Sequence, residues 1–163
     1  MRVELRVRRR DIVAGWLALS LSLGLGACLG ETADAEAPAE AWVTIRGHTV
    51  GVEIADTPQE QALGLGERDA LSWDRGMLFP YAKPAFYAFW MKGMRFSIDI
   101  IWILGDRIVD MDLNVPFEPG GNGPTLRADS LVDGVLEVPA GYAQAQGWRI
   151  GDRVVIRSSP PGR

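Results

Sequence analysis

The segment from Ile98 to Leu104 constrains the fold most, because it is apolar at every position except Asp99. A strand with one exposed face alternates apolar and polar residues, whereas a strand covered on both faces is apolar almost throughout. The run therefore predicts a strand that is buried on both faces of a sheet. Asp99 would then have to be paired or hydrogen-bonded, because an isolated buried carboxylate is costly.

Shorter patterned segments flank this run. Residues 42–46 and 50–54 alternate around a turn at Gly47-His48, which predicts a β-hairpin. Thr57-Pro58-Gln59-Glu60 has the pattern of an N-terminal capping box, and the helix that follows should end near Gly64 or Gly66. We expect short strands at 77–79 and 86–90, separated by Pro80 and Pro84, further strands at 107–113, 135–138 and 154–157, a long loop at 116–129, and a second short helix at 139–146.

Together these segments predict one mostly β domain over residues 42–157, either β-barrel-like or α+β, with two short helices. A net charge of −4 argues against a nucleic-acid partner, since phosphate binding needs a basic face. One Cys and one His argue against a disulfide framework, a zinc site or a conventional Ser-His-Asp triad. The sequence predicts no metal site and no cofactor.

The N-terminus has the pattern of an export signal. Five Arg lie within residues 1–10, and Ile12 to Ala27 carries no charge. Leu25-Gly26-Ala27-Cys28 resembles a bacterial lipobox, which predicts a signal peptide over 1–27 and lipidation of Cys28. The alternative is a plain signal peptide with an incidental Cys. Residues 28–41 would be a flexible tether and 158–163 a disordered tail, and the domain would be held at the periplasmic face of the outer membrane or on the cell surface.

Several segments, in order, match one known pattern. They are Gly64 to Arg68, Gly76 to Phe79, Phe89 to Met94, Ile98 to Ile101, Val135 to Gly141 and Gly151-Asp152. The chain resembles the domain-of-unknown-function family number 192 over about residues 43–157, with Gly93-Met94 in place of the family's usual Asn-Thr. The resemblance implies a compact β-rich domain that is often secreted, and it implies no established activity.

Charged residues within or beside apolar segments are the candidate site. Arg68, Lys92, Asp99 and Glu137 could converge on a pocket, with Trp90 as an apolar wall. The alternative is that they form structural ion pairs that hold the fold together. Aromatic residues at 73, 81, 86, 87, 89 and 90 could stack on sugar rings or pack in the core.

These residues support three hypotheses of function. We favour a non-catalytic envelope module that binds a small polar, glycan or peptide ligand through Arg68, Trp90, Lys92, Asp99 and Glu137. The second hypothesis is a cell-wall hydrolase or lyase that uses Asp99 and Glu137 as an acid–base pair. The third is a scaffold without a ligand. An enzyme predicts that the two carboxylates meet in an open cleft, and a scaffold predicts that all the charged groups are buried and mutually satisfied.

Overall fold

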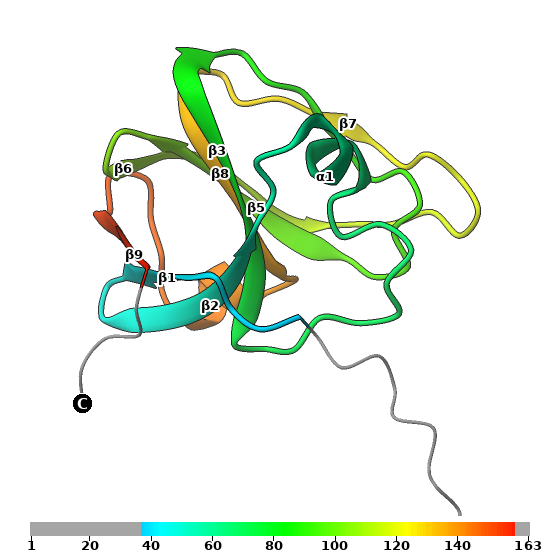
Figure 1. Cartoon of the computed structure of the whole chain (residues 1–163), viewed down its shortest axis with the longest axis horizontal. Coiled ribbons are helices and arrows are strands. Elements are labelled where there is room, and N and C mark those ends of the chain that lie inside the picture. Colours follow the sequence, from blue (N-terminus) through cyan, green and yellow to red (C-terminus); the bar gives the residue numbers. More distant parts are fainter. Residues whose placement is uncertain (1–36, 159–163) are drawn as a thin grey trace, which may run out of the picture. The chain divides into compact units, whose positions relative to one another are not determined.

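The computed structural model describes residues 37–158 and contains mostly strands (Figure 1). The elements are β1 (Ala41–Ile45), β2 (His48–Ile54), α1 (Pro58–Leu63), β3 (Arg75–Ala85), β4 (Phe89–Trp90), β5 (Ile98–Leu104), β6 (Arg107–Val115), β7 (Thr125–Leu126), β8 (Val132–Pro139), α2 (Tyr142–Ala145) and β9 (Val154–Arg157). This confirms the predicted mostly β domain with two short helices.

Seven strands form one curled sheet in the order β6-β5-β8-β3-β2-β1-β9, and β4 pairs with β7 in a second, small sheet. β1 and β2 form the predicted hairpin, but its turn lies at Arg46-Gly47, one residue before the predicted Gly47-His48, because His48 pairs with Ile45. Arg46 and Gly47 have positive φ, 51° and 82°. α1 connects β2 to β3, which pair in parallel. The backbone amides of Ile108 and Val154 donate to the carbonyls of Asp152 and Asp106, so the two outer strands approach each other and the sheet forms a half-barrel.

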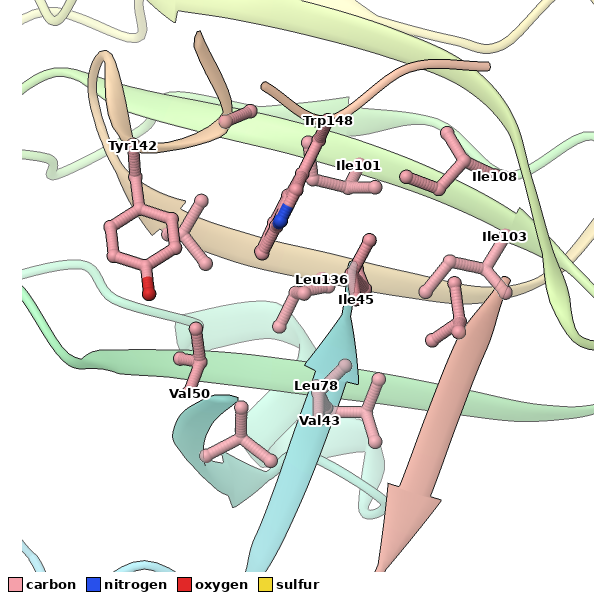
Figure 2. Close-up of a cluster of buried hydrophobic side chains, with 14 of the residues drawn as sticks. Val43, Ile45, Val50, Leu78, Ile101, Ile103, Ile108, Leu136, Tyr142 and Trp148 are labelled. Carbon is pink, nitrogen blue, oxygen red and sulfur yellow. The ribbon is translucent and has the colours of Figure 1, made fainter. Parts of the chain in front are cut away.

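The inner face of the curled sheet encloses the first hydrophobic core. Val43, Ile45, Val50, Leu78 and Ile101 point into it from four strands, β1, β2, β3 and β5 (Figure 2). Tyr142 of α2 and Trp148, which follows α2, close one side, with their ring centroids 5.3 Å apart. α2 is therefore part of the inner core.

A second core covers the other face of β3, β5 and β8. Phe79, Phe89, Met91, Ile100 and Trp102 are among its buried members. Every residue from Ile98 to Ile103 is buried, which confirms the predicted strand that is covered on both faces. The segments that cover this second face include α1 and β4, and they also form the pocket described below.

The capping box of α1 is confirmed. The Glu60 backbone amide donates to Thr57 Oγ1 at 3.2 Å, and the Thr57 amide donates to Glu60 Oε2 at 3.0 Å. The helix ends at Gly64, where φ is 53°, a backbone conformation that glycine adopts more readily than other residues. The short helix is thus held at both ends by local sequence.

Three further local predictions were wrong. β3 runs through Pro80 and Pro84 as one strand, because its ladder to β8 is interrupted between Pro80 and Ala85, where a missing N–H costs no hydrogen bond. The strand expected at 86–90 is reduced to β4. The loop expected at 116–129 contains β7, which supplies the partner for β4.

The leader lies outside the described residues, as do the lipidation site at Cys28, most of the predicted tether and all but the first residue of the predicted tail. The described end of the tether, 37–41, contacts the domain: the Ile54 amide donates to Glu40 Oε2 at 2.7 Å, and Arg75 donates to the Ala37 carbonyl. Within 37–158, no helix has the length and apolar character needed to cross a bilayer.

Candidate functional site

Asp99 is fully buried in β5 and satisfied by backbone amides. Its Oδ1 accepts from the amides of Asn114 and Gly141 at 2.7 and 3.0 Å, and its Oδ2 accepts from the Ala143 amide at 2.9 Å. Asn114 and Gly141 both have positive φ, 52° and 81°. The carboxylate therefore fixes a corner of β6 and the start of α2, which are places where the backbone has no ladder partner.

Asp99 and Glu137 do not meet. In the β5–β8 ladder, Asp99 is opposite Val138, and Glu137 is opposite Ile100. Directly opposed residues point to the same face, and successive residues point to opposite faces. Val138 belongs to the inner core and Ile100 to the outer core, so the two carboxylates lie on opposite faces of the sheet. The convergence expected for an acid–base pair is absent.

Glu137 has the opposite environment to Asp99. Its side chain is 5% exposed, and Oε2 is buried without a hydrogen-bond partner among the described residues. Burial raises the pKa of this carboxyl to about 8, and the nearby Arg68 guanidinium opposes that rise with a smaller effect. Glu137 is therefore mostly protonated at neutral pH.

Glu137 lines a pocket of about 300 Å³ between α1 and the outer face of the sheet. A Cβ built on Gly64, at the end of α1, would lie 3.9 Å from Glu137 Oε2, which places the carboxyl beneath the end of this helix. Glu137 is the one carboxylate among the described residues that line the pocket, and Lys92 is the one cation. The other lining residues are Pro58, Gln61, Ala62, Leu63, Gly64, Leu65, Phe79, Tyr81, Tyr87, Ala88, Phe89, Trp90 and Met94.

Five of the described residues that line the pocket are aromatic. Phe79 and Phe89 meet edge to face at a centroid distance of 4.9 Å, and Tyr81 and Tyr87 stack at 3.6 Å. Burial raises the pKa of Tyr81 to about 12, so its hydroxyl stays neutral and can donate a hydrogen bond. Trp90 is 47% exposed and lies at the mouth, in agreement with the apolar wall expected there.

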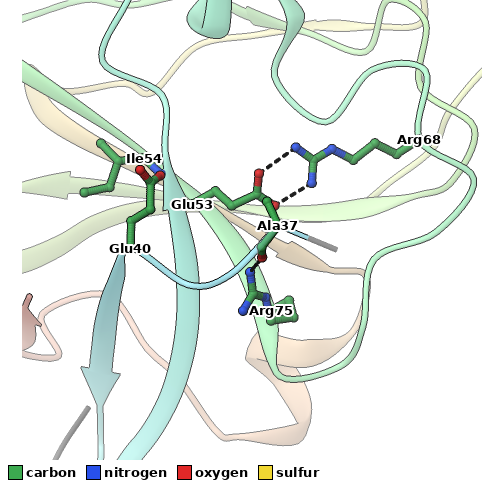
Figure 3. Close-up of polar contacts among 6 residues, drawn as sticks. All are labelled: Ala37, Glu40, Glu53, Ile54, Arg68 and Arg75. Atoms are coloured by element: carbon green, nitrogen blue, oxygen red, sulfur yellow. Dashed lines mark hydrogen bonds and ion pairs between the residues drawn. The ribbon is translucent and has the colours of Figure 1, made fainter. Parts of the chain in front are cut away.

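Arg68 forms an ion pair beside the pocket. Its Nη1 and Nη2 donate to the two carboxylate oxygens of Glu53 at 2.6 and 2.8 Å (Figure 3). Glu53, Met77 and Glu137 are in lateral register on three adjacent strands, β2, β3 and β8. Arg68 therefore neutralises the first carboxylate of this row, and among the described residues Glu137 forms no ion pair.

The comparisons with known proteins fit this architecture. A family model described as Uncharacterized ACR and named DUF192 matches residues 41–156. The chain belongs to DUF192. No curated protein matches this DUF192 chain.

Two solved structures resemble the DUF192 domain. A protein of unknown function from Novosphingobium aromaticivorans DSM 12444 is 33% identical, with a TM-score of 0.65, over 76% of this chain and 95% of that one. A protein from Sinorhizobium meliloti 1021, provisionally named a transcription regulator, is 26% identical, with a TM-score of 0.66, over 77% of this chain and 100% of that one.

The predicted site residues of this DUF192 domain divide into two groups. Trp90, Lys92 and Glu137 come together in the pocket, whereas Arg68 lies beside it and Asp99 lies on the other face. Four of the segments on which the family resemblance rested contribute lining residues: Gly64–Arg68, Gly76–Phe79, Phe89–Met94 and Val135–Gly141.

Sequence reasoning missed Glu53, and it named Tyr81 and Tyr87 only as members of the aromatic cluster that could stack on sugars or pack in the core. Glu53 occupies a polar position in an alternating strand, which normally indicates exposure. The apolar run from Ile98 to Leu104 could have indicated that Glu53 is buried. It predicts a sheet covered on both faces, and such a sheet also buries the second face of β2. Within residues 37–158, no group of three or more His, Cys, Asp or Glu side chains could hold a metal ion.

Proposed function

We propose that this DUF192 protein is an envelope lipoprotein whose domain binds a small ligand in the pocket under α1 without catalysing a reaction. One observation carries the binding role: an aromatic-walled pocket has a buried carboxyl group that lacks a hydrogen-bond partner within the described chain. Ligand sites are typically apolar clefts of about this size with a few polar groups that orient the ligand.

Two features favour this role over the other hypotheses. An acid–base mechanism with Asp99 is disfavoured, because that carboxylate makes three backbone hydrogen bonds on the other face of the sheet. A pure scaffold is disfavoured by Glu137, because a buried polar group without a partner costs stability and brings no structural benefit.

The binding role can be tested by filling the pocket. Ala62 is exposed on α1 and lines the pocket, so Ala62→Phe should occupy the mouth. Gln59→Phe is the matched control, because Gln59 is exposed on the same helix and is not a lining residue. The probes are small aromatic and aliphatic fragments that carry an amine, a carboxylate, an amide or a hydroxyl, with ligand-observed NMR as the readout.

At least one fragment should bind the full chain and the Gln59→Phe control, and Ala62→Phe should weaken that binding at least tenfold. The pocket would not be a ligand site if no fragment distinguished Ala62→Phe from the control.

The envelope location has its own test. Cys28→Ser removes the acceptor for the lipid, so the chain should move from the membrane fraction to the soluble fraction on cell fractionation. A variant that still pellets with membranes after a high-salt wash would contradict lipidation and would leave the binding role untouched.

A further inference from the structure

The pocket has one buried acidic and one exposed basic residue in its described lining. Glu137 is at the deep end, buried and without a partner for Oε2 in the described chain. Lys92 is exposed and also lines the pocket, and no described carboxylate lies within ion-pair distance of it. Rings of Phe79, Tyr81 and Phe89 lie in the wall. A ligand in the pocket would therefore contact a buried acid, an exposed cation and aromatic rings.

The deep end favours a protonated amine. A carboxylate and an ammonium group form a charge-assisted hydrogen bond, which is stronger than one between neutral groups. Aromatic faces also attract cations, and the attraction grows when the cation is desolvated. A neutral hydroxyl or amide would satisfy Oε2 as well, but it would gain little from the rings.

The charged groups that face Glu137 leave room for this role. Arg68 is engaged by both oxygens of Glu53, and the Tyr81 hydroxyl stays neutral. Across the ladders Glu137 faces Met77 and Ile100, which carry no charge. Lys92 is the remaining cation of the wall, and it would repel an amine that carried no negative group of its own.

Resting on the proposed function, we propose that the ligand is an amino-acid-like zwitterion. Its protonated amine pairs with Glu137, its apolar part lies among the rings, and its carboxylate pairs with Lys92 at the mouth.

Four probes of one shape separate the two charges. L-phenylalanine carries both, phenethylamine only the amine, 3-phenylpropionate only the carboxylate, and 3-phenylpropanol neither. Isothermal titration of the full chain at pH 7.5 should rank L-phenylalanine first, by about tenfold or more over each of the other three.

Two variants test which residue contacts each charge of the ligand. Glu137→Gln keeps the shape of the side chain and should remove the preference for L-phenylalanine over 3-phenylpropionate. Lys92→Gln should remove the preference for L-phenylalanine over phenethylamine. Lys83→Gln changes the other lysine, which is exposed and does not line the pocket, and it should change neither preference.

The pH dependence is a second readout. Free Glu137 holds a proton below pH 8, and the ammonium ligand requires the carboxylate, so binding releases that proton. The affinity for L-phenylalanine should therefore rise between pH 6 and pH 8, by up to tenfold per pH unit, and should be flat in Glu137→Gln. Affinity that fell over this range would indicate that a protonated Glu137 donates to a neutral acceptor.

The possible failures are distinguishable. If 3-phenylpropionate or 3-phenylpropanol binds as tightly as L-phenylalanine and Ala62→Phe removes that binding, the pocket is a ligand site and the zwitterion proposal is wrong. If none of the four probes binds, the zwitterion proposal is also wrong. The fragment panel with Ala62→Phe and Gln59→Phe then decides independently whether the pocket binds any ligand.

Discussion

Asp99 and Glu137 are carboxylates of adjacent paired strands, both almost completely buried, and the protein treats them in opposite ways. Asp99 receives three backbone hydrogen bonds on the inner face of the sheet. Glu137 has a buried oxygen without a partner in the described chain and lines a pocket on the outer face. Asp99 therefore holds backbone amides in place, whereas Glu137 can be contacted by a ligand that enters the pocket.

The two carboxylates differ in what compensates the cost of their burial. Burial is costly for both groups, but backbone amides compensate Asp99 and nothing described in the fold compensates Glu137. A compensated charge is explained by stability alone. An uncompensated one that lines a pocket is better explained by binding, because functional sites often sacrifice stability.

The largest expected effect is at Asp99. Asp99→Asn replaces one acceptor oxygen by a donor that faces the amides of a β6 corner or the start of α2. Urea unfolding of the full chain should show a loss of about 3–5 kcal/mol, the range for breaking a buried charged interaction. The control Asp129→Asn changes an exposed side chain and should stay within about 0.5 kcal/mol. A similarly small loss for Asp99→Asn would erase the contrast between the two carboxylates.

Glu137→Gln should instead increase the free energy of unfolding at neutral and higher pH. The pKa rises from 4.5 to about 8 on folding, so between these values the unfolded chain has lost a proton that the folded chain keeps. Stability of the wild type therefore falls as pH rises from about 4.5 to 8, and is unaffected by this group below that range. The variant removes the pH-dependent cost, and its buried amide lacks hydrogen bonds much as the protonated acid of the wild type does.

Unfolding curves should thus show Glu137→Gln about as stable as wild type at pH 4, and about 4 kcal/mol more stable at pH 8. If the variant were less stable at pH 8, the Glu137 carboxylate would have a stabilising partner, and its contrast with Asp99 would disappear.

Arg68→Met should give the smallest change in the free energy of unfolding. It tests how Arg68 affects the two carboxylates on the outer face, Glu53 and Glu137. It leaves Glu53 without its bidentate partner, and because the Arg68 side chain is 29% exposed we expect a loss of about 1–2 kcal/mol. It also removes the positive charge that opposes the rise in the pKa of Glu137, so that pKa should rise further. NMR titration of ¹³C-labelled glutamate side chains would measure this shift, and a lower pKa would contradict it.

Much of the fold could be predicted from local patterns. The hairpin of β1 and β2, the capping box at Thr57 and the doubly buried β5 depend on neighbours in sequence, and all three were confirmed. β7 and the unbroken β3 could not be predicted, because they depend on which distant strand supplies hydrogen bonds. The candidate site divides in the same way: the sequence suggested one pocket for all the candidate residues, but only Trp90, Lys92 and Glu137 line it, and the sequence did not separate them from Arg68 and Asp99.

The sequence by itself determined that Asp99 lies in a strand buried on both faces, because the apolar residues around it leave no exposed position. It placed Glu137 between Leu136 and Val138 in a short strand, where alternation left an exposed position open. It also placed a covered sheet at the centre of the domain. Only the tertiary structure decided which carboxylate is satisfied. The register of β5 on β8 sends the two groups to opposite faces, and the covering segments bring amides to Asp99 but rings and a cavity to Glu137. Period-two alternation shows that two residues differ in face, whereas the partners on each face come from segments far away in the chain.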